Sequence, residues 1–105
     1  IGFGLSIDDL NLPTSFGVHQ NYPNPFNPST NIDYDLPEDS FVSITIFDMM
    51  GRIVNQSTFE NQSAGFQSFK WNGTNDRGSL VSAGVYFYSI RTKNNFETRK
   101  MIMLK

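Results

Sequence analysis

The chain has 105 residues, a formal net charge of −2, 38% hydrophobic residues and 14% aromatic residues. This apolar and aromatic content excludes a disordered tail and suffices for one core, while the negative net charge argues against a nucleic-acid binder. The absence of cysteine excludes disulfides and cysteine-ligated zinc, and no apolar run reaches the roughly 18 residues of a transmembrane segment.

The beginning of the chain, residues 1–12, has no clear hydrophobic period. We expect a linker or leading segment there, followed by one domain over residues 13–105. The opening letters IGFGLSIDDL lack the basic start of a signal peptide, and Ile1 in place of Met favours a piece of a longer protein. Residues 13–20 are predicted to form a short first strand.

A stiff segment follows at residues 20–30, QNYPNPFNPST. Proline has no amide N–H and pushes the residue before it towards extended geometry. We therefore predict a rigid strap between the first and second strands, with Tyr22 and Phe26 as apolar anchors and the asparagines satisfying backbone groups. The strap consists of Tyr22, Pro23, Asn24, Pro25, Phe26, Asn27 and Pro28.

Alternation of apolar and polar residues predicts β-strands along the rest of the chain. In residues 30–36, for example, Ile32, Tyr34 and Leu36 share one face. Gly51 supplies the positive φ that a hairpin turn needs. The other predicted strands are residues 41–48, 52–59, 66–71, 85–92 and 96–105.

About seven strands at near-regular spacing, without any helical period, predict an all-β fold. The natural arrangement is an antiparallel β-sandwich of two sheets, and a small barrel is the alternative. Aromatic residues in such a sandwich are expected in the core, although they could also form a platform for stacking sugars. These aromatic residues are Phe66, Phe69, Trp71, Tyr86, Phe87 and Tyr88.

The charges are distributed unevenly. Residues 1–51 hold seven acids and no lysine or arginine, whereas residues 52–105 hold three acids and all eight bases. Acidic early strands could pair with basic late strands in one sheet, or a basic edge could meet an anionic partner. Five of the bases lie in the last fifteen residues: Arg91, Lys93, Arg99, Lys100 and Lys105.

Catalytic patterns are weak, and we expect no enzyme and no catalytic residues. His19 is the only histidine, and no serine lies in a G-x-S-x-G context. Asp33 and Asp35 share a strand face, where acids usually serve solubility rather than glycoside hydrolysis.

An oxygen-rich loop, NGTNDRG at residues 72–78, is the one candidate for a metal ion. The candidate calcium ligands are Asn72, Asn75 and Asp76. The loop lacks EF-hand spacing, and Asx residues beside glycine form turns unaided. We therefore expect no metal and no cofactor, with calcium as the single cation worth testing. Glycosylation sequons at Asn55, Asn61 and Asn72 are too short a pattern to carry weight.

Three blocks of sequence resemble, in order, a known family. The blocks are QNYPNPFNPSTNIDYDLPEDSFVSITIFDMMGRIV (20–54), WNGTNDRGSLVSAGVYFYSI (71–90) and TRKMIMLK (98–105). They look like the opening, the W-x-G…G…V-x-[AS]-G-x-Y-x-Y middle and the K-x-x-x-x-K final strand of the type A C-terminal sorting domain of the bacterial type IX secretion system. The middle block also occurs in the immunoglobulin-like domain of flagellar hook-capping proteins.

This resemblance implies an immunoglobulin-like sandwich that acts as a non-catalytic secretion signal. Such domains address a fused N-terminal cargo to an outer-membrane translocon, through a shuttle and a sortase that attaches the cargo to the cell surface. The cargo would leave through the periplasm and outer membrane, and cleavage would fall in or near residues 1–19. The recognition residues implied by the resemblance are Gly84, Tyr86, Tyr88, Lys100 and Lys105.

A structural or adhesive immunoglobulin-like module that stays on a surface or filament protein is the alternative function. The last strand alternates Met101 and Met103 against Lys100, Ile102 and Leu104. We expect it to form an edge strand that is open to β-augmentation by a receptor or to self-association by strand pairing.

Overall fold

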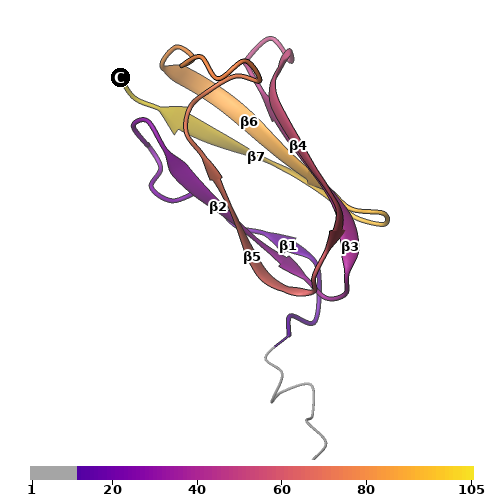
Figure 1. Ribbon diagram of the computed structural model, residues 1–105. Helices are drawn as coiled ribbons and strands as arrows, with labels where there is room; N and C mark the ends of the chain where they lie inside the picture. Colours follow the sequence, from indigo (N-terminus) through magenta and orange to yellow (C-terminus); the bar gives the residue numbers. More distant parts are fainter. Residues whose placement is uncertain (1–11) are drawn as a thin grey trace, which may run out of the picture.

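The computed structural model describes residues 12–105, so all but the last residue of the predicted leading segment lies outside the described residues. The described chain forms two antiparallel sheets packed face to face and contains no helix (Figure 1). The sheets have the strand orders β1-β2-β5 and β4-β3-β6-β7. The strands are β1 (Gly17–Val18), β2 (Thr30–Leu36), β3 (Ser40–Phe47), β4 (Ile53–Gln62), β5 (Gly65–Trp71), β6 (Gly84–Arg91) and β7 (Phe96–Met103).

The core lies between the sheets and follows the alternation in the sequence. Every second residue of β2, β3 and β6 is buried, because successive side chains of a strand point to opposite faces of its sheet. Trp71 and Met101 add the largest pieces from β5 and β7. The predicted all-β sandwich of seven strands is therefore confirmed.

The small barrel is ruled out for the described residues, because no strand ladder joins the two sheets. Side chains bridge the gap at the β1–β7 side instead. Arg99 Nε donates to Val18 O at 2.7 Å, and Val18 N donates to Glu97 Oε1 at 3.3 Å. These two contacts satisfy the outward backbone groups of the short strand β1.

The predicted pairing of acidic early strands with basic late strands is wrong for β2. Asp33 and Asp35 lie on β2, whereas the basic strands β6 and β7 belong to the other sheet. Within residues 12–105 the ion pairs are His19–Asp35, Asp48–Arg52 and Glu97–Arg99. No helix among these residues is long and apolar enough to cross a membrane.

Candidate functional site

The three sequence blocks converge at one end of the sandwich, beside the chain end marked C in Figure 1. There the strap, the loop between β5 and β6 and the end of β7 surround a groove of about 370 Å³. We call it the tail groove. It is lined by Asn27, Pro28, Leu80, Val81, Ser82, Ala83, Met103, Leu104 and Lys105.

The strap lies along the outer edge of β7. Phe26 N donates to Ile102 O at 3.0 Å, and Leu104 N donates to Phe26 O at 2.8 Å. Asn24 Oδ1 accepts the amide of Ile102 at 3.0 Å. Just before the strap, Gln20 Nε2 donates to Lys100 O at 2.8 Å. Each of these backbone groups points away from β6.

The prediction of an open edge on β7 is therefore wrong over residues 100–104. A strand can accept a new neighbour only where its outward N–H and C=O groups are free. The strap already occupies these groups, and Phe26 forms a parallel bridge with Met103. The end of the chain presents side chains, such as the half-exposed Leu104, rather than backbone.

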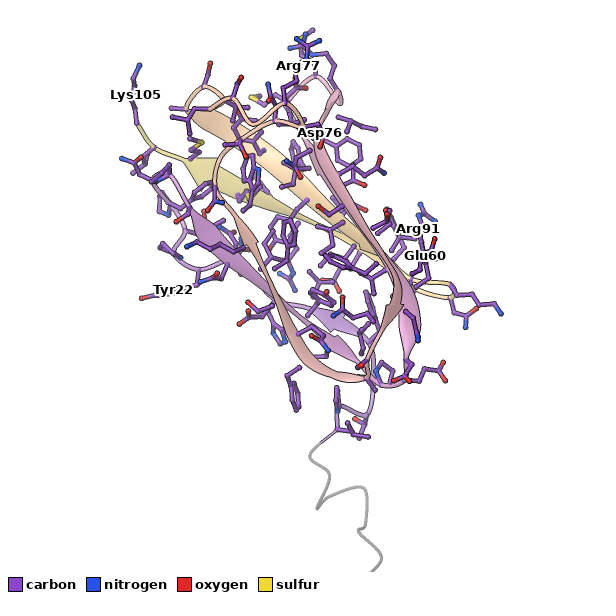
Figure 2. All side chains as sticks on the ribbon, viewed as in Figure 1. Tyr22, Glu60, Asp76, Arg77, Arg91 and Lys105 are labelled. Atoms are coloured by element: carbon purple, nitrogen blue, oxygen red, sulfur yellow. The ribbon has the colours of Figure 1, made fainter. Side chains whose placement is uncertain are left out.

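The two predicted aromatic anchors behave differently. Phe26 is buried and packs against Trp71 with ring centroids 5.7 Å apart, as predicted. Tyr22 is 79% exposed and points away from the domain in Figure 2, so its anchoring role is wrong. The reason is local pairing, because Tyr22 and Asn31 exchange both backbone hydrogen bonds at 2.9 Å and this register turns the Tyr22 ring outward.

Two of the three asparagines, Asn21 and Asn24, satisfy backbone groups around the strap as predicted, whereas no hydrogen bond within residues 12–105 uses the Asn27 side chain. Asn21 is buried, and its Nδ2 donates to Pro23 O at 3.1 Å and to Thr30 Oγ1 at 3.0 Å. Thr30 Oγ1 in turn donates to Pro23 O at 2.8 Å. Asn24 Oδ1 accepts the amide of Ile102, while Asn27 lines the tail groove.

The W-x-G motif places a glycine under the strap. Gly73 has a φ of +72°, and a Cβ there would lie 2.7 Å from Pro28 O and 3.0 Å from Met103 Cε. Trp71 Nε1 donates to Thr74 O at 2.8 Å, which fixes the loop beside the core. Gly73 is the supporting residue that sequence reasoning missed, although its place in the middle block could have revealed it.

The motif residues of β6 support this end from inside. Tyr86 packs against Trp71 at 5.5 Å, and its hydroxyl donates to Ser82 O. The Tyr88 hydroxyl donates to His19 O at 2.7 Å and accepts the amide of Asn21 at 2.9 Å. Burial raises the pKa of both tyrosines, so they stay neutral donors.

Of the five predicted recognition residues, only the two lysines present a side chain to solvent. Tyr86 and Tyr88 are buried, and Gly84 begins β6 with a φ of +152°. Lys105 projects away from the domain in Figure 2, and Lys100 lies on the outer face of β7 opposite Phe87. The structure thus brings these residues to one end and one strand pair but separates them into supports and exposed groups.

The candidate calcium loop uses its oxygens for turn formation. Asn75 Oδ1 accepts the amides of Arg77 and Ser79, both at 3.0 Å. Asp76 Oδ1 accepts the amide of Gln56 at 3.0 Å, which fastens the loop to the edge of β4. Residues 12–105 contain no group of three or more His, Cys, Asp or Glu side chains that could hold a metal ion.

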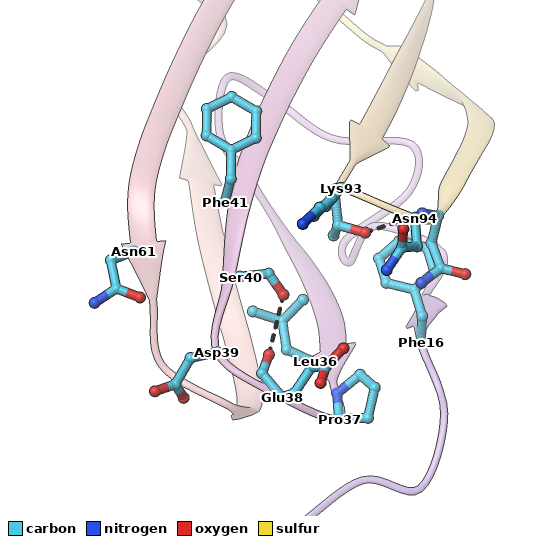
Figure 3. Close-up of a pocket in the computed structure, with 12 residues that line it drawn as sticks. Phe16, Leu36, Pro37, Glu38, Asp39, Ser40, Phe41, Asn61, Lys93 and Asn94 are labelled. Atoms are coloured by element: carbon cyan, nitrogen blue, oxygen red, sulfur yellow. Dashed lines mark hydrogen bonds between the residues drawn. The ribbon is translucent and has the colours of Figure 1, made fainter.

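A second hollow, of about 230 Å³, lies at the other end of the sandwich (Figure 3). It sits between the β2–β3 and β6–β7 turns, with Phe16 and Leu36 among its lining residues. Its polar groups serve the turns, since Ser40 Oγ donates to Glu38 O at 3.0 Å and Asp39 accepts the amide of Ala64 at 2.8 Å.

His19, the only histidine, lies on the outer face of the three-stranded sheet. Its Nε2 is 3.0 Å from Asp35 Oδ2, and the imidazole is half exposed. Ser68 lines the same shallow hollow, but within residues 12–105 no hydrogen bond joins it to His19. The geometry is that of a surface pair rather than a nucleophile activated by a base.

Fold and site together define an immunoglobulin-like β-sandwich domain whose strap and last strand are fastened at one end. The chain belongs to the FlgD Ig-like domain family, whose profile matches residues 26–95. No curated protein matches the chain.

Solved structures extend this likeness. The crystal structure of dimeric latent PorU from Porphyromonas gingivalis is 23% identical, with a TM-score of 0.65 over 81% of this chain and 9% of that chain. FlgD from P. aeruginosa is 27% identical, with a TM-score of 0.57 over 70% of this chain and 57% of that chain. PorZ, a surface component of the type-IX secretion system of Porphyromonas gingivalis, is 22% identical, with a TM-score of 0.58 over 86% of this chain and 11% of that chain. The chain therefore spans about a tenth of PorU and PorZ.

Proposed function

We propose that this domain is a non-catalytic secretion signal that directs a fused N-terminal cargo to a type IX outer-membrane translocon. The observation that carries the proposal is the convergence of all three family-like sequence blocks on the strap, the tail groove and the end of β7. The fold-level likeness to PorZ, a type-IX surface component, and the family membership support it. The cargo would reach the cell surface or the extracellular space.

The contact surface in this proposal is made of side chains. Because the strap covers the outer edge of β7, a shuttle or sortase would read Leu104, Lys105 and the walls of the tail groove. Tyr86, Tyr88 and Gly73 hold that surface in place, in the way that packed residues support a binding site. Cleavage by the sortase would fall before the domain, in or near residues 1–19.

The experiment is export of a periplasmic reporter fused to residues 1–105 in a type IX host. Removal of Leu104 and Lys105 should abolish export, since both are exposed and β7 keeps its core residues Met101 and Met103. Lys100→Glu should reduce export, whereas the matched Lys70→Glu on β5 should not. Circular dichroism establishes that each variant is folded. Unchanged export of the shortened and Lys100→Glu proteins contradicts the proposal.

A module that remains on the mature protein is the second candidate. Mass spectrometry of the surface-exposed cargo distinguishes the two, because a retained module would still be attached. Self-association by strand pairing would then use the outer edge of β5, which ends its sheet, since the strap covers the end of β7.

A further inference from the structure

The outer face of the four-stranded sheet carries a groove of about 550 Å³. We call it the sheet groove. A row of polar side chains crosses its floor, one from each strand, in the order Gln56, Thr45, Ser89 and Thr98. The floor is nearly closed to solvent at its centre, where Thr45 is 8% and Ser89 6% exposed.

Apolar side chains form the two walls of the sheet groove. Phe47 and Ile53 are cross-strand partners on one side, and Phe41 and Phe96 lie on the other. Phe96 is 56% exposed, and the guanidinium of Arg91 lies 4.7 Å from the centre of its ring. The volume falls within the range of about 300–1,000 Å³ that is typical of ligand sites.

The floor and walls have the chemistry that recognises sugars. Serine and threonine hydroxyls both donate and accept hydrogen bonds, as a sugar hydroxyl requires. Only one hydrogen bond within residues 12–105 uses floor side chains, from Gln56 Nε2 to Thr45 Oγ1 at 3.1 Å. The apolar C–H face of a sugar ring is attracted to the negative face of an aromatic ring.

A peptide strand would have few hydrogen-bond partners in the sheet groove, because such a strand binds through backbone groups. The backbone N–H and C=O groups of a sheet lie in its plane and bond neighbouring strands. The two central strands, β3 and β6, have a neighbour on both sides. Their backbone groups are used, so the groove offers a ligand only side chains.

Arg91 and Lys100 favour an anionic ligand on this face, and together they outweigh the exposed acid Glu60 of β4, which Figure 2 draws beside Arg91. Among residues 12–105, Arg91 is the only charged residue that lines the sheet groove, and it points away from the core in Figure 2. Lys100 stands on the same face of β7, opposite Phe87. The acid of β7, Glu97, pairs with Arg99 and bonds Val18 across the gap between the sheets, so it does not cancel these charges.

We propose that the sheet groove binds a linear acidic polysaccharide, with a uronate carboxylate at Arg91 and a sugar ring on the face of Phe96 that Arg91 does not cover. The hydroxyls of the chain would lie along the Thr45, Ser89 and Thr98 row. This site lies on the outer face of the sheet, away from the tail groove, and does not depend on the proposed secretion function.

The probe is hexagalacturonate, added to the isotope-labelled full chain and followed by amide chemical shifts. Saturable shifts should appear at Thr45, Ser89 and Thr98, at ligand concentrations up to about 10 mM, which is ample for a millimolar complex. Cellohexaose, which is neutral, should bind more weakly. Hexaglutamate, which has the charge without sugar rings, should also bind more weakly.

Variants locate the site and exclude general attraction. Phe96→Ala and Arg91→Gln should each weaken binding about fivefold, as expected for one aromatic or one charge-assisted contact. Phe66→Ala is the matched control, since Phe66 is 60% exposed on the other sheet and should change nothing.

Four results would overturn the proposal. They are the absence of saturable shifts with hexagalacturonate, shifts that map to the other sheet, equal binding of hexaglutamate, and equal effects of Phe96→Ala and Phe66→Ala. Sedimentation that reveals a dimer dissociated by Phe96→Ala would also overturn it, because a second copy would then cover this face.

Discussion

Gly73 lies at a position where there is no room for a Cβ atom. Its φ of +72° lies in the left-handed region that favours glycine, and the space beside it is filled by the Pro28 carbonyl and the Met103 side chain. Any side chain would therefore push the strap or the end of β7 outward. The strap, the loop after β5 and the last strand meet at this one residue.

Gly73→Ala should destabilise the domain by about 1–3 kcal/mol, because backbone strain and a contact with Pro28 O add together. Urea unfolding followed by tryptophan fluorescence measures the change. Gly78→Ala is the control, since Gly78 has a similar φ of +83° but no atom within 4 Å of a Cβ. If the two variants lose the same stability, crowding under the strap has no role.

Tyr34 makes stability depend on alkaline pH. Burial raises its pKa from 10.0 to about 12, and its hydroxyl bonds Gln62 Oε1 at 3.1 Å. The folded state favours the neutral form of Tyr34. Its contribution to the free energy of unfolding is therefore complete below pH 10 and is lost as the pH rises from 10 to about 12.

Between pH 10 and 12 the free energy of unfolding of the Tyr34→Phe protein should therefore fall by about 2 kcal/mol less than that of the native protein. Urea unfolding at several pH values measures this difference, and ultraviolet titration follows tyrosinate formation. Equal losses in the two proteins would show that Tyr34 ionises as easily when folded as when unfolded.

The strap and β7 form a pair of elements that stabilise each other. The strap supplies the missing neighbour of the last strand, through two backbone hydrogen bonds at Phe26 and one from the Asn24 side chain. β7 in turn gives the proline-rich segment partners that its own residues cannot supply. An edge that would otherwise invite strand addition is thereby closed.

Asn24→Ala should loosen this edge without unfolding the domain. The Ile102 amide loses its acceptor, so its hydrogen exchange should speed up, and global stability should fall by only about 0.5–1.5 kcal/mol. Asn27→Ala is the control, because Asn27 is exposed and lines the tail groove. Unchanged exchange at Ile102 in the Asn24→Ala protein contradicts the fastening role of the strap.

The whole domain is closed on one side and open on the other. On the β1–β7 side, Glu97 and Arg99 satisfy the outward groups of β1 at Val18, and the strap covers the end of β7. On the other side β5 ends its sheet at an edge with Phe66 exposed, while the β5–β6 loop fastens part of β4 through Asp76. Further strands are therefore expected at the outer edge of β5 rather than along the covered end of β7.

Calcium should not change the melting temperature of the domain. Asn75 and Asp76 each direct a side-chain oxygen to backbone amides, which leaves the loop few free ligands for a cation. Thermal unfolding with calcium and with a chelator measures this, since a ligand that binds only the folded state must stabilise it. A rise in melting temperature with calcium would revive the metal site.

Periodicity in the chain was enough to predict the strands and the buried faces of β2, β3 and β6, whereas Phe66 of β5 was expected in the core and is 60% exposed. Ile32, Tyr34 and Leu36 follow a period of two, and that period holds whatever the strand pairs with. The prolines likewise predicted a segment unable to continue a sheet ladder. The two predicted anchors show the limit of local sequence patterns. Phe26 and Tyr22 both lie among the prolines of the strap, yet Phe26 is buried and Tyr22 is exposed.

The other features of the fold and of the candidate site depend on contacts between residues that are far apart in the sequence. The strap lies on the edge of β7, the Tyr88 hydroxyl reaches His19 and Asn21, and Arg99 reaches Val18, all between residues more than sixty positions apart. Such contacts depend on the order of strands in two separate sheets, which residue alternation does not encode. Alternation of apolar and polar residues determines which face of each strand is buried. Which strands become neighbours is determined only when the complete chain packs.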